Sequence, residues 1–194
     1  MKRAEDIMHK IRLTPVLLLS LLLMINLYSC ENNHNSTSKS DSYKSNKNNK
    51  NLSSKKMKVE TEAYLQRNEK IVSSIQKMDG KDLKEQRTII TKAKSRLKDN
   101  NDNYSKLIND HNIPESYYKT KDILKYFKDV YGLLDDLDRT LKDIEQNKDY
   151  SKIKDLSKIQ DKYYKQFNGK KEAEINEFLE KHDIKTELFK QDEF

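Results

Sequence analysis

The chain has little of the residues that staple, kink or interrupt a protein: its 194 residues include one cysteine, three glycines and two prolines. A single cysteine, Cys30, excludes disulfides within the chain and any metal site built on several cysteines. No segment shows a convincing strand pattern. Together with 37% charged residues, these shortages are typical of long helices joined by short loops, so the expected fold class is all-α.

The residue patterns of common catalytic and metal sites are missing as well. There is no glycine-rich phosphate loop, no Gly-x-Ser-x-Gly elbow, and no H-x-x-x-H or H-E-x-x-H spacing. His111 and His182 each lie near an expected helix end beside an aspartate, where capping or solvation accounts for them. Asp135, Asp136 and Asp138 would splay around a helix, so a solvated face is expected there and not a cation site. We expect no catalytic residue, no metal and no cofactor.

The formal net charge of +7 suggests a nucleic-acid binder until the charge is divided along the chain. Residues 1–29 carry a net charge of +2 and residues 30–58 carry +5, whereas residues 59–194 contain 28 basic and 28 acidic side chains. The positive excess therefore belongs to the first 58 residues, and the remainder is neutral. We expect no nucleic-acid partner.

The N-terminus has the order of a secretory signal. Four basic residues precede an apolar run over residues 16–27, and the small residue Ser29 follows that run. Twelve helical residues span about 18 Å, less than the roughly 30 Å of a hydrocarbon core, so a permanent transmembrane helix is the weaker interpretation. We expect residues 1–29 to be a signal that is cleaved between Ser29 and Cys30. An ordinary signal peptide with an unrelated cysteine nearby is the alternative.

A polar segment follows the signal. Residues 31–56 are dominated by Asn, Ser and Lys, and only Tyr43 and Leu52 could bury useful apolar surface. Such a composition cannot offset the entropy of ordering, so we expect a disordered tether over residues 30–56, beginning with Cys30. Its lysines could contact an anionic membrane surface, or the segment could be a solvated spacer. Composition does not distinguish the two.

Helical periodicity begins at Met57 and defines a third region, residues 57–194. Its clearest part is an apolar seam with alternating spacings of four and three, formed by Ile123, Phe127, Val130, Leu134, Leu137, Leu141 and Ile144. Weaker seams run through residues 64–78, 83–104 and 153–179, the last with a change of phase. The prediction is an antiparallel bundle of three to four long helices with packing like that of a coiled coil. Gly132 lies within the main seam, which indicates a closely crossing helix or, less favoured, a bend.

The expected breaks between helices are marked by turn and cap residues. Gly80 is expected to end the first helix in the left-handed conformation, and Pro114 separates the second from the third. Ser151 is a candidate N-cap for the fourth helix. Gly169, after Asn168, either interrupts or ends that helix. A terminal segment, residues 186–189, is expected to pack its apolar residues back on the bundle.

Tyrosine is the one enriched aromatic residue, and two adjacent pairs are candidates for an interaction surface. Tyr117 and Tyr118 form one pair, and Tyr163 and Tyr164 form the other. Neighbours on a helix point in different directions, so one ring of each pair is expected at the surface or at a groove edge. Tyrosine suits protein interfaces and stacking on sugar rings. The favoured alternative is that these rings complete the rim of the core.

The residues around the cysteine resemble a known processing signal. Leu27-Tyr28-Ser29-Cys30 resembles the lipobox of bacterial lipoproteins, which runs leucine, variable, small, cysteine. The resemblance implies that the Cys30 thiol receives a diacylglycerol and becomes the first residue of the mature chain. It further implies a protein held on the extracytoplasmic face of the cell membrane. It gives the single cysteine a role.

The layout as a whole is similar to small helical lipoproteins of Gram-positive bacteria, of the staphylococcal type. The similarity includes the abundance of Asn and Lys and the tail segments 168–179 and 184–189. Cell-wall-binding lipoproteins of bacilli (the YkyA type) share the plan of lipobox, tether and helical bundle. Neither resemblance implies an established activity.

Two functions from different classes follow from these features. The first is a non-catalytic envelope lipoprotein whose body binds peptidoglycan, a membrane protein or a host factor. The second is a solute-binding or carrier lipoprotein with a pocket between helices, which would need a cavity of roughly 300–1,000 Å³. An enzyme is not expected. The sequence identifies neither the partner nor the oligomeric state.

Overall fold

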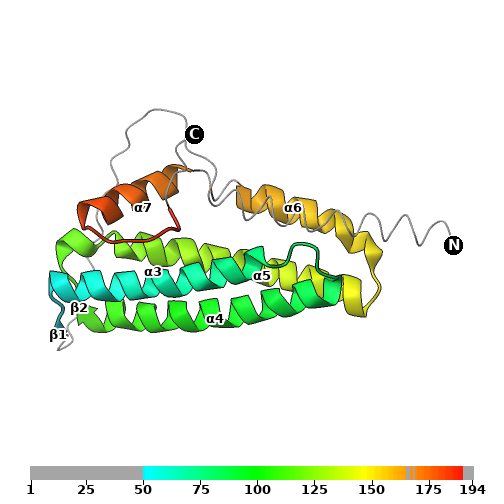
Figure 1. The fold of residues 1–194 in the computed structure, drawn as a ribbon, viewed down its shortest axis with the longest axis horizontal. Coiled ribbons are helices and arrows are strands. Elements are labelled where there is room, and N and C mark those ends of the chain that lie inside the picture. Colours follow the sequence, from blue (N-terminus) through cyan, green and yellow to red (C-terminus); the bar gives the residue numbers. More distant parts are fainter. Residues whose placement is uncertain (1–49, 165–166, 168, 190–194) are drawn as a thin grey trace.

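The structure, a computed structural model, describes residues 50–164, 167 and 169–189. Within these residues lie the helices α3 (Ser54–Gln76), α4 (Leu83–Asp110), α5 (Thr120–Gln146), α6 (Ile153–Tyr164) and α7 (Lys170–Lys181). In Figure 1, α3, α4 and α5 run alongside one another as a long layer, and α6 and α7 lie along one side of it. The expected all-α helical bundle is confirmed.

The first two long helices begin at polar caps. α3 starts after Ser53, whose hydroxyl accepts a hydrogen bond from the Lys56 amide at 3.2 Å, so the helix begins three residues before the expected position. α4 starts after Asp82, whose carboxylate accepts from the Glu85 amide at 2.8 Å. These side chains satisfy amides that have no partner inside a helix, which fixes where each helix begins.

The turns confirm two of the expected breaks and correct a third. Gly80, after α3, has φ 72°, and Gly169, before α7, has φ 74°, so both adopt the left-handed conformation that glycine tolerates. The expected N-cap at Ser151 is wrong. Asp149 accepts from the Ser151 amide at 3.2 Å and caps a short 3₁₀ turn, Tyr150–Lys152, which leads directly into α6 at Ile153. The fourth expected helix is divided into α6 and α7.

A short parallel ladder contradicts the expectation of no strand. β1 (Lys50–Asn51) pairs with β2 (His111–Asn112), and the Leu52 amide donates to the Asn112 carbonyl at 2.9 Å. The ladder joins the chain before α3 to the connection after α4 (Figure 1). Two residues are too few to produce a periodic pattern, and for this reason the sequence does not reveal them.

The core is centred on α5, which packs against α4 on one side and α6 on another. All seven residues of the main seam are buried, as predicted. The other seams are buried in large part, through Tyr64, Ile71, Ile75, Met78, Ile90, Leu97, Tyr104, Leu156, Ile159, Tyr163 and Phe167. The terminal segment packs back as expected, because Leu188 and Phe189 are buried and the Phe189 ring lies 5.4 Å from that of Tyr126.

Gly132 marks the place where α6 approaches α5 most tightly. A Cβ atom at this position would lie 2.9 Å from the Tyr163 hydroxyl oxygen. Such a distance is too short for a Cβ contact, so any larger residue here would require the Tyr163 hydroxyl to move. The closely crossing helix, which was the favoured interpretation of Gly132, is therefore the correct one.

Candidate functional site

The first tyrosine pair is divided between the core and the surface. The Tyr117 side chain is 3% exposed, and its ring lies 5.9 Å from that of Phe178 and 4.4 Å from that of His182. Tyr118 is 53% exposed, and the Lys121 ammonium lies 5.1 Å from its ring centroid. Only Tyr118 of this pair is therefore available to a partner.

The second pair belongs to α6. Tyr163 is buried, donates a hydrogen bond to the Asp136 carboxylate at 3.1 Å and stacks on Phe167 with centroids 6.1 Å apart. The side chain of Tyr164 lies outside the described part of the chain. Tyr117 contacts α7, whereas Tyr163 contacts the middle of α5. The structure therefore does not bring these two rings into one patch.

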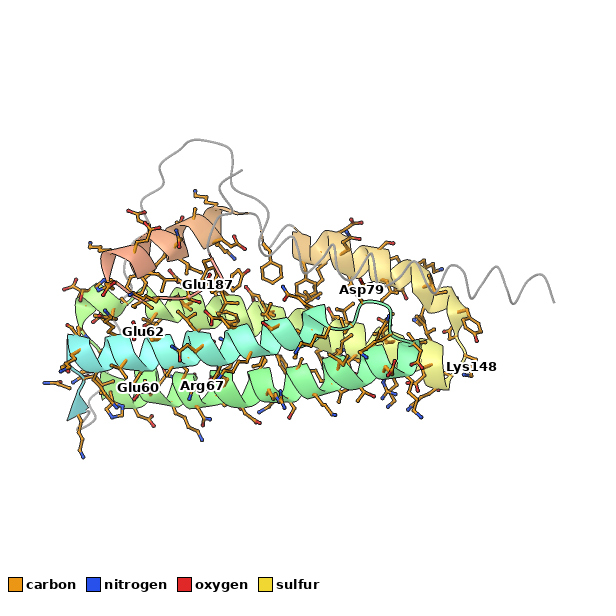
Figure 2. The ribbon with its side chains drawn as sticks, in the orientation of Figure 1. Glu60, Glu62, Arg67, Asp79, Lys148 and Glu187 are labelled. Carbon is orange, nitrogen blue, oxygen red and sulfur yellow. The ribbon has the colours of Figure 1, made fainter. Side chains whose placement is uncertain are left out.

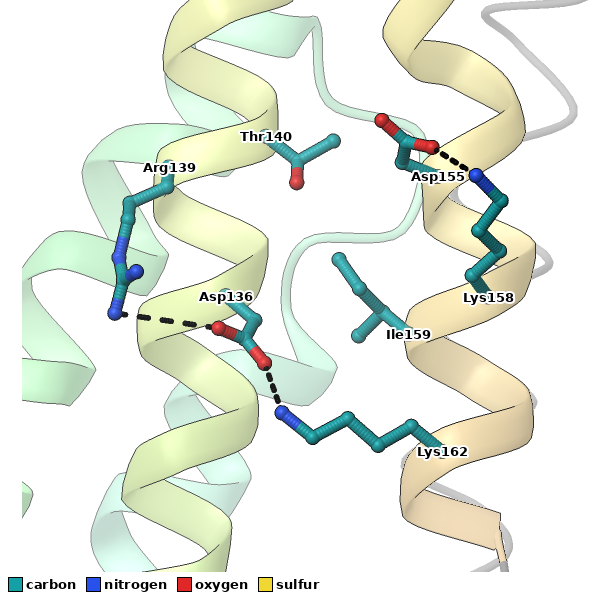
Figure 3. A pocket seen from close by; sticks show the side chains of 7 residues that line it. All are labelled: Asp136, Arg139, Thr140, Asp155, Lys158, Ile159 and Lys162. Atoms are coloured by element: carbon teal, nitrogen blue, oxygen red, sulfur yellow. Dashed lines mark hydrogen bonds and ion pairs between the residues drawn. The ribbon is translucent and has the colours of Figure 1, made fainter.

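A shallow groove of about 280 Å³ lies between α5 and α6 (Figure 3). Its lining residues are Asp136, Arg139, Thr140, Asp155, Lys158, Ile159 and Lys162. Lys162 donates to Asp136 at 2.7 Å, and Lys158 donates to Asp155 at 2.9 Å. The first pair crosses the groove and the second lies within α6, and because both signs are present the groove is not a single-signed site for an ionic ligand.

The acidic cluster on α5 is not the solvated face that its spacing suggested. The Lys94 ammonium contacts Asp135 at 3.1 Å and Asp138 at 2.6 Å. Arg87 contacts Asp138 at 3.5 Å and Glu145 at 2.6 Å. The carboxylates on α5 therefore bind cations on α4 and join the two helices. Hydrogen bonds from Arg139 and then Lys94 hold the pKa of Asp135 below its usual value.

A second cleft, of about 270 Å³, lies between α5 and α7. Its lining residues are Lys119, Asp122, Lys125, Tyr126, Lys171, Glu174 and Ile175. Lys119 contacts Glu174 at 2.8 Å and Asp122 at 3.1 Å, which ties the start of α5 to α7. Both clefts are smaller than a typical small-molecule pocket. Neither is the deep tyrosine-lined cavity that a carrier would favour.

Near the first turn of α7, the side-chain oxygens of two residues, Tyr126 and Glu172, are buried. Within the described ranges, the Tyr126 hydroxyl and both carboxylate oxygens of Glu172 make no hydrogen bond of good geometry, although the hydroxyl and the amides at the start of α7 lie near enough to act on the carboxylate. Burial raises the pKa of Glu172, although nearby backbone amides, the Tyr126 hydroxyl and Lys171 oppose the rise. Burial also raises the pKa of Tyr126. Sequence reasoning missed this pair, because its two members lie 46 positions apart on different helices.

The two histidines of the folded body lie at helix ends. His111 follows α4, and its Nδ1 lies 3.0 Å from the Leu107 carbonyl oxygen. His182 follows α7, and its ring packs against Tyr117 and Phe178. In the part of the chain that the structure describes, no three His, Cys, Asp or Glu side chains are grouped so as to hold a metal ion.

A buried polar network joins α3, α4 and α5 and was not predicted. The Tyr64 hydroxyl donates to the Asn101 side chain at 2.6 Å, and Asn101 donates to the Phe127 carbonyl at 3.2 Å. The rings of Tyr64 and Tyr104 stack with centroids 4.1 Å apart, and the Tyr104 hydroxyl lies 2.8 Å from that of Thr61. Burial raises the pKa of Tyr104 to about 12. Asn101 lies in phase with the α4 seam, which is the signal that could have revealed it.

The lipidation and cleavage residues, Cys30 and Ser29, lie outside the described residues. None of the helices that the structure describes combines the length and apolar character needed to cross a bilayer. No protein-family model, curated protein or solved structure matches this chain.

Proposed function

We propose that this chain is a lipoprotein of the bacterial cell envelope, anchored through diacylglycerol on Cys30, and that its helical body is a non-catalytic binding module. The observation that carries the proposal is the order of features at the N-terminus: basic residues, an apolar run over residues 16–27, then Leu27-Tyr28-Ser29-Cys30. Residues 59–194 are neutral in charge, so the lysines of residues 39–47, which precede the folded body, are left to support contact with an anionic leaflet.

The chain enters the body at one end of the long layer. The β1–β2 ladder holds Lys50 and Asn51 beside the connection after α4, at one end of the long layer. Asp79 and Lys148 lie at the opposite end (Figure 2). In this proposal the tether joins the body at the ladder end, and its flexible length sets how far the body can reach from the bilayer.

Binding without catalysis is favoured by the chemistry of the grooves. The charged side chains of both clefts are paired in large part with each other, as in Lys162 with Asp136 and Lys119 with Glu174. The exposed aromatic candidate is Tyr118, which presents an apolar ring next to a cation, Lys121. Such a surface suits a glycan or a protein partner. We take wall polymer as the first partner to test.

The cleft between α5 and α7 is the observation on which the alternative of a solute carrier rests. Its volume of about 270 Å³ approaches the lower limit for small ligands, and a buried tyrosine, Tyr126, lines it. Equilibrium dialysis against mixed small solutes distinguishes the alternatives. A carrier retains solute and does not sediment with peptidoglycan, whereas the envelope-binding module sediments and retains no solute.

The anchor is tested by substitution of the cysteine. Cys30→Ser is expected to abolish labelling by a fatty-acid analogue and to release the body from membranes or leave the precursor uncut. Tyr28→Ala is the matched control, because it changes the variable position of the lipobox and is expected to retain the label. An unlabelled wild-type protein would refute the lipoprotein proposal.

The interaction surface is tested with two exposed tyrosines. Tyr118→Ala is expected to weaken sedimentation with purified peptidoglycan, whereas Tyr150→Ala, at a position 42% exposed near the other end of the bundle, is expected to have no effect. Equal binding by both variants would exclude Tyr118 from the interface. A wild-type protein that does not sediment would exclude peptidoglycan as the partner.

A further inference from the structure

α7 and the residues after it form a segment that is separated from the rest of the bundle by turns. α7 and the terminal segment, residues 182–189, lie along one side of α3 and α5 (Figure 1). Residues of positive φ stand at both ends of α7, with Gly169 at 74° and Asp183 at 49°. Such positions allow the chain to change direction sharply, so α7 is a separate segment between two defined turns.

Polar contacts hold this segment at its edges. Asp183 accepts from Lys58 at 2.6 Å, and the Glu69 carboxylate accepts from the Glu187 amide at 2.7 Å and from the Thr186 hydroxyl. These contacts are largely exposed to solvent. Exposed ion pairs and hydrogen bonds of this kind contribute little to stability, so the edges do not by themselves fix the segment.

Apolar contacts attach its inner face to the core. Ile175, Phe178 and Leu179 are buried on α7, and Phe178 packs edge-on against Tyr117. Phe189 packs against Tyr126 with ring centroids 5.4 Å apart. Removal of the segment would expose these rings, because it covers an apolar face of α5.

Glu172 and Tyr126 are the exception on this inner face. Both oxygens of the Glu172 carboxylate are inaccessible to water, and neither accepts a hydrogen bond of good geometry in the described part of the chain. The Tyr126 hydroxyl from α5 is in the same condition. An ionised Glu172 therefore places a negative charge in a buried position as long as α7 is docked, which disfavours the docked state.

We propose that α7 and residues 182–189 form a lid on the three-helix core, and that a proton on Glu172 closes it. Among the described residues, the groups that act on this carboxyl are Tyr126 from α5, Lys171 from α7 itself and the backbone amides at the start of α7. The adjacent cleft adds Lys119, Asp122 and Lys125 from α5 and Glu174 from α7, of which Lys119 and Glu174 are paired.

The sign of the effect follows from burial. Burial raises the pKa of Glu172 in the docked state, whereas an undocked Glu172 is solvated and titrates in its usual range. The docked state therefore binds a proton more tightly than the undocked state. Closure is favoured at acid pH, and that advantage is lost as the pH rises through the raised pKa. The lid opens more often in neutral solution than in acid.

Hydrogen exchange of the full chain from pH 5 to pH 8, corrected for the intrinsic pH dependence, tests this device. In the wild type, amides of residues 170–189 are expected to lose protection as the pH rises, and amides of α4 are not. Glu172→Gln keeps the size of the side chain without the charge. We expect it to slow lid exchange by about threefold to tenfold at neutral pH and to remove the pH dependence.

Two further variants separate a titrating role from a structural one. Glu177→Gln changes an exposed carboxylate on the same helix and is expected to leave the pH profile of the wild type unchanged. Tyr126→Phe removes a hydroxyl that lowers the pKa of Glu172, so the midpoint of lid opening is expected to move to higher pH. The proposal fails if the exchange of residues 170–189 in Glu172→Gln depends on pH as it does in the wild type. It also fails if the lid and α4 lose protection together, because global unfolding would then account for the exchange. The exchange of the lid and the exchange of α4 are both measured on the body and do not depend on the membrane anchor, so this proposal can fail while the proposed function stands.

Discussion

The hydroxyl oxygen of Tyr163 on α6 lies 2.9 Å from the position that a Cβ atom would occupy at Gly132 on α5. The same hydroxyl donates to Asp136, one turn further along α5. A glycine in the middle of a long helix is therefore retained at the point where a neighbouring phenol inserts. Glycine in a helix interior costs about 1 kcal/mol relative to alanine, and here the close contact between helices offsets that loss.

The contact between Gly132 and Tyr163 predicts that Gly132→Ala has opposite effects on stability in the wild type and in a Tyr163→Phe protein. Gly132→Ala in the wild type is expected to destabilise the bundle, because the methyl group would displace the Tyr163 hydroxyl from Asp136. In a Tyr163→Phe background the obstructing oxygen is absent, and the same substitution is expected to stabilise the helix by about 0.5–1 kcal/mol. Urea unfolding of the four proteins measures the difference. An equal effect in both backgrounds would contradict the proposed contact.

The buried network around Asn101 predicts a large loss of stability. Asn101→Ala would leave the Tyr64 hydroxyl without its partner, would remove the side-chain donor from the Phe127 carbonyl and would create a small cavity. The expected loss in the free energy of unfolding is about 2–4 kcal/mol. Asn103→Ala, on the exposed face of the same helix, is expected to change stability by less than about 0.5 kcal/mol. A combined Tyr64→Phe and Asn101→Leu protein is expected to recover part of the loss, since both polar partners are then removed.

The main features of the bundle could be predicted because they depend on spacing within one helix. The seam from Ile123 to Ile144 has one period throughout, and every member is buried. Gly80 and Gly169 mark turns because few other residues tolerate a positive φ. The placement of Gly132 against a crossing helix follows from the same reasoning, since an interior glycine needs a local cause.

Features that depend on two helices could not be predicted in this way. Whether Asp135 and Asp138 meet water or cations depends on the rotation of α4, which presents Lys94 to them. The burial of Glu172 depends on where α7 docks. The ladder between Lys50–Asn51 and His111–Asn112 joins segments about 60 residues apart and has no internal pattern. Neighbouring polar residues can also both be suited to cap the same helix start, and here Asp149 takes the capping position expected of Ser151.

The contacts between α4 and α5 predict unequal effects of two aspartate substitutions. Asp138 has a side chain only 14% exposed and contacts Lys94 and Arg87, so Asp138→Asn is expected to lower the free energy of unfolding by about 1–2 kcal/mol. Asp102 pairs with Lys98 on the exposed face of α4, where its side chain is 52% exposed, and Asp102→Asn is expected to have little effect. Chemical denaturation of both variants checks the comparison. An equal loss from each would show that burial does not strengthen the Asp138 contacts.

Asp135 predicts a specific dependence of stability on pH. Arg139 and Lys94 lower the pKa of Asp135 from its usual value of 3.8, so the folded state binds a proton at this site less tightly than the unfolded state does. The resulting stabilisation is present above the usual pKa and is lost as the pH falls through the lowered value.

Asp135→Asn should therefore be less stable than the wild type at pH 7, and the difference should shrink below about pH 4. Thermal unfolding of both proteins from pH 7 to pH 2 measures this, with Asp99→Asn, an exposed change on α4, as the control. A difference that is constant over this range would indicate that packing, and not the charge of Asp135, determines the effect.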